Sequence, residues 1–270
     1  MSWASRRRSA YTLGTILFFA VLIGGPILYW YVRIPETCSD GIKNGDETLT
    51  DKGGSCPLLD EHLLSPHAIL WTREFSVRLP APAGQAGGQA GDGTYNVIAY
   101  VENPNKDAGV MQAPYRFKLY DARNVLVAER EGVGFIMPGT ITPVFEGAID
   151  TGNRKVARAY LEFTAPLVWE RVYDATLPIA VESKTISDVS AEPRLMVTVK
   201  NTSVADLRNA QFVASIFDTA GNAFAGSSTV IPLLSNGERK EIVFTWPDPF
   251  VYVPGRIDVL PVLKPSNKKP

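Results

Sequence analysis

The sequence predicts a mainly β protein that begins with one transmembrane helix and continues into two tandem β-sandwich domains. Three observations lead to this fold class. A long uncharged run follows three arginines near the N-terminus, and short segments of alternating apolar residues begin at about residue 66. The same series of segments then recurs roughly a hundred residues later, which is the size of one sandwich domain.

The composition permits folded domains and gives no global electrostatic signal. The chain has 270 residues, of which 45% are hydrophobic, enough to bury a sizeable core. Its formal net charge is only -1. We therefore expect no nucleic-acid partner, because such proteins carry a strong basic balance.

The uncharged run covers residues 11–32 and is predicted to span the membrane. It is about as long as the ~20 residues that cross a ~30 Å hydrocarbon core. Residues 6–8 are all arginine, whereas Arg33 stands alone before Glu36 on the other side. The positive-inside rule therefore predicts a cytoplasmic segment 1–10 and an extracytoplasmic remainder, in a single-pass protein of the plasma membrane.

A cleaved signal peptide is the main alternative to this anchor, since both begin with basic residues and an apolar run. The run is longer than the usual apolar region of a signal, and no A-x-A-like cleavage site follows it. A lipoprotein signal before Cys38 lacks the apolar and small residues that it requires. The flanking arginines and the absence of a polar face also argue against a soluble core helix.

Cys38 and Cys56 are the only cysteines, and we predict that they form a disulfide. They enclose a polar, glycine-rich segment that has no core of its own, within a loop motif predicted at residues 36–60. Disulfides persist outside the cytoplasm, and closing this loop would stabilise it by roughly 3 kcal/mol through the unfolded chain.

The same segment, "CSDGIKNGDETLTDKGGSC", resembles a small cysteine-rich motif of bacterial surface proteins and some secreted eukaryotic proteins. That motif reads C-x-D-G-x-x-N-x-x-E-T-x-x-D-C-G-G-x-C-x-x-C. The matching positions are Cys38, Asp40, Gly41, Asn44, Glu47, Thr48, Asp51, Gly53, Gly54 and Cys56. Lys52 and Leu59 replace the motif's second and fourth cysteines. The paired loss implies that the motif joins its first cysteine to its third and its second to its fourth.

The acidic residues of this loop form a candidate calcium site. Ca²⁺ prefers oxygen ligands that converge in a tight turn. The candidate ligands are Asp40, Asn44, Asp46, Glu47 and Asp51. The alternative is that they solvate an exposed turn which the Asn-Gly and Asp-Gly pairs permit.

A candidate zinc site follows the loop but has weaker support. His62 and His67 lie near Asp60 and Glu61, and these residue types can ligate zinc. Two histidines without thiolates are weak evidence for zinc, and a polar linker is the favoured interpretation.

Residues 66–172 and 176–264 are the two predicted sandwiches, and residues 265–270 form a basic tail. Each sandwich region contains several short apolar segments bounded by turn residues. Examples are "EFSVRL", "YNVIAYVENP", "YRFKLYD", "RLMVTVKNTS" and "AQFVASIFD". Matching segments end in Asn103 and Asn201, or in Asp121 and Asp218, which indicates tandem copies.

The segment "FKLYD" resembles the name-giving motif of the FxLYD family of extracytoplasmic β-sandwich domains. The matching residues are Phe117, Leu119, Tyr120 and Asp121. The second copy is degenerate, with Ala214, Ile216, Phe217 and Asp218. The resemblance implies immunoglobulin-like sandwiches and attachment at the cell surface, and it implies no established catalysis.

The motif also has a purely structural explanation. With a two-residue strand period, Phe117 and Leu119 share one face of the strand, and Tyr120 lies on the other. Asp121 can then accept backbone N–H groups of the following turn. We therefore assign these residues a role in folding.

The sequence favours binding or scaffolding over catalysis. It shows no phosphate-binding loop and no nucleophile elbow, and it has no cofactor motif other than the candidate calcium site. Carboxylates such as Asp121 and Glu129 leave a minor glycosidase alternative. We expect a membrane-anchored binding or scaffold protein of the bacterial envelope, in contact with the lipid bilayer and another envelope protein. The alternatives are a structural subunit of a secretion, pilus or division assembly and a solute-binding receptor.

Overall fold

The computed structural model describes residues 3–32, 38–77, 93–152, 154–173 and 177–264. The chain divides into two units, Met1–Cys56 and Pro57–Pro270, and each is described by itself. The protein is mainly β, with 53% strand and 10% helix, as the sequence predicts. The predicted tail, residues 265–270, lies outside the described residues.

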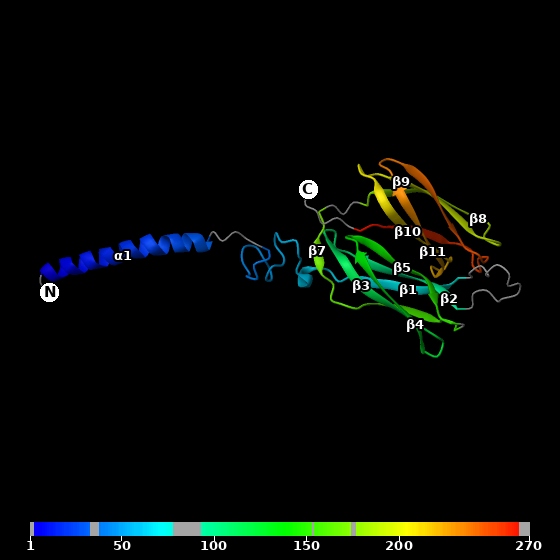
Figure 1. Cartoon of the computed structure of the whole chain (residues 1–270), viewed down its shortest axis with the longest axis horizontal. Coiled ribbons are helices and arrows are strands. Elements are labelled where there is room, and N and C mark those ends of the chain that lie inside the picture. Colours follow the sequence, from blue (N-terminus) through cyan, green and yellow to red (C-terminus); the bar gives the residue numbers. More distant parts are fainter. Residues whose placement is uncertain (1–2, 33–37, 78–92, 153, 174–176, 265–270) are drawn as a thin grey trace. The chain divides into compact units, whose positions relative to one another are not determined.

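The first unit contains α1 (Trp3–Val32), drawn in blue in Figure 1. Its segment Tyr11–Tyr29 has a mean hydropathy of 1.9 and no buried residue. The prediction of one N-terminal helix long and apolar enough to cross a membrane is therefore confirmed. A helix can cross a bilayer because its backbone groups are hydrogen-bonded within the segment.

The predicted disulfide is also present in this unit. Cys38 and Cys56 are joined, with their Cα atoms 5.4 Å apart, and they close a loop with a sequence separation of 18. An isolated antiparallel bridge joins Leu49 to Lys52 within the loop. The covalent bond thus holds a segment that is mostly exposed and has little apolar packing.

The second unit begins with a short 3-10 helix, Glu61–Leu63, and then forms a first sandwich of two antiparallel sheets. One sheet has the order β1-β2-β5, and the other has the order β4-β3-β6 with β7 also paired to β3. The strands are β1 (Ala68–Ser76), β2 (Thr94–Asn103), β3 (Ala108–Tyr120), β4 (Leu126–Ile136), β5 (Thr140–Asp150), β6 (Arg158–Phe163) and β7 (Trp169–Arg171).

A second sandwich follows, with sheets β12-β9-β8 and β11-β10-β13. Its strand order repeats that of the first sandwich, with β8, β9 and β12 in the places of β1, β2 and β5. The strands are β8 (Ile179–Ser187), β9 (Arg194–Asn201), β10 (Leu207–Phe217), β11 (Ala223–Leu234), β12 (Arg239–Thr245) and β13 (Arg256–Val262).

Two buried asparagines occupy matching positions at the ends of β2 and β9. Asn103 donates from its side-chain nitrogen to the carbonyls of Ala108 and Met137. Asn201 donates likewise to the carbonyls of Ala205 and Leu234. Both side chains are fully buried, so each satisfies loop carbonyls that would otherwise lack a partner.

Each sandwich has its own hydrophobic core between its two sheets. The first is filled from β2 and β3 by alternate residues, such as Val97, Val101, Phe117 and Leu119. The second is filled from β9, β10 and β12, with Phe212 and Phe244 as its largest rings. Leu59, which the sequence places in the loop segment, is buried in the first core.

A third buried cluster joins the two sandwiches through the opposite faces of β2 and β10. It contains Phe75, Ile98, Tyr100, Val213, Phe217 and Ala223. Sheet β1-β2-β5 therefore packs on sheet β11-β10-β13, and four layers of sheet lie in succession (Figure 1).

Aromatic contacts order this cluster. The ring centres of Trp71 and Tyr100 are 4.2 Å apart, and the Arg256 guanidinium lies 3.8 Å from the centre of the Phe217 ring. Burial raises the pKa of Tyr100 well above its usual range.

This third cluster fixes the two sandwiches to each other. Burying one Phe or Val side chain contributes about 1.5–3 kcal/mol, and several such residues share this contact. The two sandwiches are therefore held together by a packed apolar contact between their sheets.

Strand predictions were less accurate at the edges of the sheets. The sequence places a strand at "EFSVRL", whereas β1 begins at Ala68. It does not identify β8, in which only Ile179 is buried and the other residues are exposed or half-buried. Both are edge strands in which the apolar alternation is weak.

Candidate functional site

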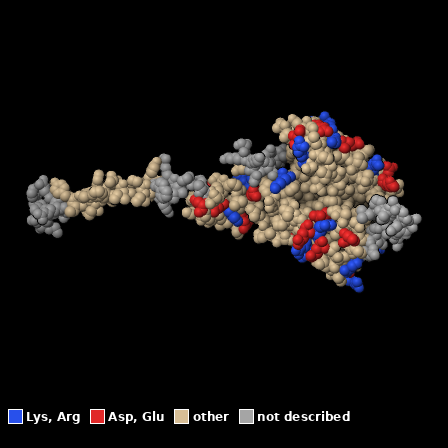
Figure 2. Space-filling model, viewed as in Figure 1, with Lys and Arg blue, Asp and Glu red and all other residues tan. Residues whose placement is uncertain are grey.

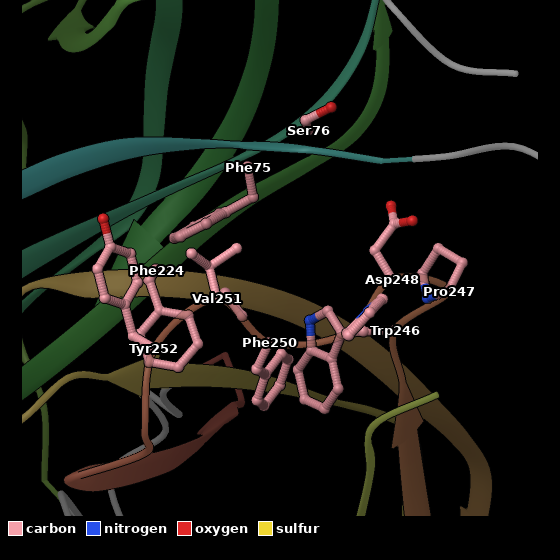
Figure 3. Close-up of a pocket in the computed structure, with 11 residues that line it drawn as sticks. Phe75, Ser76, Phe224, Trp246, Pro247, Asp248, Phe250, Val251 and Tyr252 are labelled. Carbon is pink, nitrogen blue, oxygen red and sulfur yellow. The ribbon is translucent and has the colours of Figure 1, made fainter. Parts of the chain in front are cut away.

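The main candidate site is an aromatic pocket where the two sandwiches meet, with a volume of about 220 Å³ (Figure 3). The pocket lies at the end of β1 that is formed by Ser76. The chain enters the unit near Ala68, at the opposite end of this strand. The lining residues are Phe75, Ser76, Phe224, Ala225, Trp246, Pro247, Asp248, Pro249, Phe250, Val251 and Tyr252.

Three structural elements build this pocket. Phe75 and Ser76 are the last residues of β1, and Phe224 and Ala225 lie at the start of β11. The other lining residues come from the connection between β12 and β13. Two prolines in that connection, at positions 247 and 249, lack an N–H and do not extend the strand ladder.

Backbone hydrogen bonds hold the connection at three points. Trp246 N donates to Pro193 O at 3.0 Å, and Phe250 N donates to Val189 O at 2.8 Å. Gly255 N donates to Phe217 O at 2.8 Å. A Cβ at Gly255 would meet the carbonyl oxygen of Asp218 at 2.8 Å, so a glycine permits this close approach.

The aromatic rings pack edge to face. The ring of Phe224 lies 5.2 Å from that of Phe250 and 5.6 Å from that of Tyr252. The Trp246 ring lies 5.2 Å from that of Phe250. These distances suit the electrostatics of aromatic pairs and give the pocket an ordered wall.

The pocket has few polar groups. Asp248 is the one charged side chain among the described lining residues, and Ser76 and Tyr252 carry hydroxyls. Within the described part of the chain, the buried Trp246 Nε1 has no hydrogen-bond partner. A buried N–H without an acceptor is costly and calls for an explanation.

Next to the pocket, the connection ends in an exposed apolar tip formed by Val251, Tyr252 and Val253. Their side chains are 84%, 56% and 75% exposed. No charged residue occurs from Pro249 to Gly255. Contiguous exposed apolar residues of this kind mark an interaction surface more often than single ones do.

The candidate calcium residues lie in the disulfide loop, where their carboxylates accept backbone hydrogen bonds. Asp51 Oδ1 accepts from the N–H of Asp40 at 3.0 Å, and Glu47 Oε2 accepts from the N–H groups of Asn44 and Asp51. Asp46 Oδ1 accepts from Ser55 N at 3.0 Å. These bonds give the acids a structural role in the turn.

Asn44 Oδ1 is the oxygen of this set that is buried without a partner among the described residues. Ligand atoms of Cys38, Glu47 and Cys56 lie within 4.8 Å of one another, but both sulfurs belong to the disulfide. The calcium site therefore stays a prediction.

The two histidines of the zinc hypothesis make different contacts. His62 Nδ1 lies 3.0 Å from Asp60 Oδ1, and Asp60 also caps the short 3-10 helix. The His67 ring packs at 5.5 Å from Phe163 and at 5.9 Å from Trp169. Burial lowers the pKa of His67, as expected for an imidazole against apolar rings.

The residues of the FxLYD-like segment are placed as the strand period predicts. Phe117 and Leu119 are fully buried in the first core, while Tyr120 packs against Tyr160 on the other face. Asp121 Oδ1 accepts from the N–H groups of Arg123 and Val125, which confirms its predicted role in the turn.

Asp121 also forms an ion pair that the sequence does not predict. Its Oδ2 lies 2.8 Å from Arg154 Nη2, on the connection between β5 and β6. The N–H of Val125, and then Arg154, hold the pKa of Asp121 below its usual range. Glu129 lies opposite Lys118 in the ladder of β3 and β4. These contacts explain both carboxylates as parts of the sandwich.

The aromatic pocket was not predicted from the sequence. The segment "WPDPFVYVPG" carries the signal that could have identified it, because its apolar residues fall between strands and are interrupted by prolines. Its partners at residues 75 and 224 lie far away in sequence, and only the stacking of the two sandwiches brings them together.

Comparisons with known proteins leave the site unassigned. No protein-family model matches the chain, and no curated protein matches it. Among solved structures, a β-glucuronidase from glycoside hydrolase family 2 is 11% identical, with 58% of this chain and 20% of that chain covered and a TM-score of 0.23. The Bacteroides uniformis β-glucuronidase is 16% identical, with 64% and 22% covered and a TM-score of 0.18.

A Parabacteroides merdae β-glucuronidase is 11% identical, with 72% of this chain and 34% of that chain covered and a TM-score of 0.20. This chain thus spans about a fifth to a third of the length of these three structures. At such low TM-scores the likeness carries no argument about fold or catalysis.

Proposed function

We propose that this protein is a membrane-anchored, extracytoplasmic binding or scaffold protein of the bacterial cell envelope, without catalytic activity. The observation that carries the proposal is the aromatic pocket with its exposed apolar tip, on a unit that follows a helix of membrane-spanning length. Such a surface suits a protein partner better than it suits bulk solvent.

The proposed topology is a single pass through the plasma membrane with the N-terminus in the cytoplasm. It is supported by the arginines at positions 6–8 and by the disulfide, which persists in an oxidising compartment. Alkaline phosphatase fused after residue 264 should be active, and the same fusion after residue 10 should be inactive. The reverse pattern would contradict this topology.

The proposed fold lineage is a pair of immunoglobulin-like sandwiches related to the FxLYD domain, the second being a degenerate copy. The shared strand order and the matching asparagines support a duplication. The proposal assigns the "FKLYD" segment to folding and places binding at the pocket.

Cross-linking in cells tests the proposed function. We expect a tagged full-length protein, cross-linked and then solubilised, to capture one envelope protein at near-equal abundance. A wild-type capture that contains only the bait would contradict the binding function and favour the structural subunit, which would cross-link to itself.

Calcium in the disulfide loop is a separate proposal. Hard oxygens of Asp40, Asn44 and Asp51 lie in one small loop, and Asn44 Oδ1 has no partner in the described part of the chain. Calorimetric titration of the full-length protein with Ca²⁺ should show one site that Asp51→Ala removes. No heat of binding at millimolar Ca²⁺ would contradict it.

A further inference from the structure

The chemistry of the aromatic pocket restricts the kind of ligand that it can take. The described lining residues include one carboxylate, that of Asp248, and no lysine, arginine or histidine. Figure 2 shows lysines and arginines on other parts of the visible surface, and none of them is among the described lining residues. An anionic ligand would find no cation among these residues to neutralise it, and it would lie close to a carboxylate.

The size of the pocket excludes a large buried solute. A volume of about 220 Å³ holds one or two rings, and the exposed tip at Val251, Tyr252 and Val253 continues the apolar surface beyond it. This combination fits an extended chain that inserts one or two side chains and lies along the tip with the rest.

The polar groups distinguish a peptide from a sugar. A sugar ring carries many hydroxyls and needs several convergent hydrogen-bonding side chains. Besides one carboxylate and two hydroxyls, the described lining offers aromatic faces and an indole N–H, Trp246 Nε1, that lacks an acceptor in the described part of the chain. A carbonyl group on an otherwise apolar ligand would supply the hydrogen-bond acceptor that this N–H lacks.

We propose that this pocket binds a proline-rich, extended segment of a partner protein, an inference that rests on the binding function proposed above. A polyproline II chain presents apolar rings and backbone carbonyls without internal hydrogen bonds, and proline has no N–H that would need an acceptor. Aromatic-lined grooves recognise such chains at a low entropic cost because the ligand is already extended.

Each pocket residue then has a defined role. The rings of Phe75, Phe224, Phe250 and Tyr252 contact the proline rings, and Trp246 Nε1 donates to a ligand carbonyl. In Figure 3, Val251 is drawn between Phe75 and Trp246. Its side chain is 84% exposed, so few contacts hold it, and the ligand displaces it to reach the N–H.

Fluorescence anisotropy with full-length protein in nanodiscs tests the proposal. The probe is a fluorescein-labelled decaproline peptide, and the comparison is a Gly/Ser peptide of equal length. We expect saturable binding of decaproline only. Binding of neither peptide, or equal binding of both, overturns the proposal. Displacement of decaproline by a neutral oligosaccharide at lower concentration than by unlabelled decaproline also overturns it.

Two substitutions locate the binding site. Tyr252→Ser should raise the Kd at least tenfold, whereas Tyr160→Ser is the matched control and should leave it unchanged. The two tyrosines are 56% and 54% exposed, and Tyr160 lies on β6 outside the pocket. Trp246→Phe keeps an aromatic ring but removes the N–H together with part of the indole, and we expect a smaller rise of about fivefold. Equal effects of the two tyrosine variants overturn the proposal.

The result is separable from the cross-linking test of function. Decaproline binding requires no cellular partner. If a partner is captured equally by wild type and Tyr252→Ser, and decaproline does not bind, then the ligand class is wrong and the binding function stands. If decaproline binds and wild type captures no partner, then the scaffold function is wrong and the assigned pocket chemistry stands.

Discussion

Strands β3 and β10 occupy the same place in the two sandwiches, yet their outward faces are opposite in chemistry. Inward residues agree: Phe117 and Leu119 fill one core as Ala214 and Ile216 fill the other. Outward, β3 carries Arg116, Lys118 and Tyr120, whereas β10 carries Val213, Ser215 and Phe217 at the matching positions. The shared inward pattern therefore specifies the sandwich, and the outward pattern specifies what the sandwich packs against.

This difference explains why the stack contains two sandwiches. Sheet β11-β10-β13 packs on sheet β1-β2-β5, whereas its equivalent in the first sandwich is sheet β4-β3-β6. Such a head-to-tail contact could in principle continue through further copies. On β3, Lys118 pairs with Glu162 at 2.8 Å and Arg116 pairs with Glu131. A charged outer face ends the series, as in the terminal units of repeat proteins.

The largest expected effect concerns Phe217, which is buried and occupies on β10 the position that Tyr120 occupies on β3. Phe217→Ala should lower the free energy of unfolding by about 3–5 kcal/mol, because it leaves a cavity between the sandwiches. Tyr120→Ala, at the matching half-buried position, should cost less, about 1–2 kcal/mol, because the Tyr120 ring is partly exposed and packs on Tyr160. Urea denaturation of the full-length protein in nanodiscs measures both, and equal losses would contradict the stacked arrangement.

The next effect concerns the two buried asparagines, which occupy matching positions in the two sandwiches. Asn103→Ala and Asn201→Ala should each cost about 1–3 kcal/mol, because each leaves buried loop carbonyls without a donor. The same denaturation experiment should give similar losses for both. A large loss at one asparagine and none at the other would show that the matching geometry does not reflect a shared role.

A smaller effect on stability, together with self-association, is expected when the outward face of β3 is changed to resemble that of β10. The triple variant Arg116→Val, Lys118→Ser, Tyr120→Phe removes exposed ion pairs, which contribute about 0–1 kcal/mol each. It also creates an apolar patch of the kind that β10 buries. Light scattering after gel filtration should show a concentration-dependent increase in mass over wild type, whereas Glu131→Gln alone should show none.

The sequence was sufficient for the elements whose pattern depends on a local period. Val97 and Val101, or Phe117 and Leu119, alternate inward as half-buried strands do, and the apolar run of α1 needs no tertiary information. The two-sided burial of β2 was not predicted, since the segment was interpreted as a half-buried strand, although "VIAYV" is continuously apolar.

The pocket and the edge strand β8 could not be predicted in the same way. Trp246 and Phe75 are brought together only by the stacking of the sandwiches, which no local pattern encodes. The exposed residues of β8 show no apolar alternation to detect.

The smallest expected effect separates Asp121 from Asp218. Both carboxylates accept N–H groups of the following turn, and backbone hydrogen bonds are the main cause that lowers the pKa of each. Among the described residues, Asp121 also pairs with arginines, Arg154 at 2.8 Å and Arg123 at 3.8 Å, whereas Asp218 pairs with none. A carboxyl whose folded pKa is lowered stabilises the protein above its ordinary pKa of 3.8, and this contribution is lost as the pH falls through the folded value.

At pH 7, Asp121→Asn should therefore lower the Tm more than Asp218→Asn does, because the amide keeps the turn's acceptor and loses the ion pair. The difference between the variants should shrink as the pH falls below 3.8, where the wild-type carboxyls become protonated as well. Scanning fluorimetry between pH 7 and pH 3 measures this, with Arg154→Gln as the matched removal of the partner. A difference that stays constant over this range would mean that the Asp121 charge does not stabilise the first sandwich, and the two turns would then be equivalent.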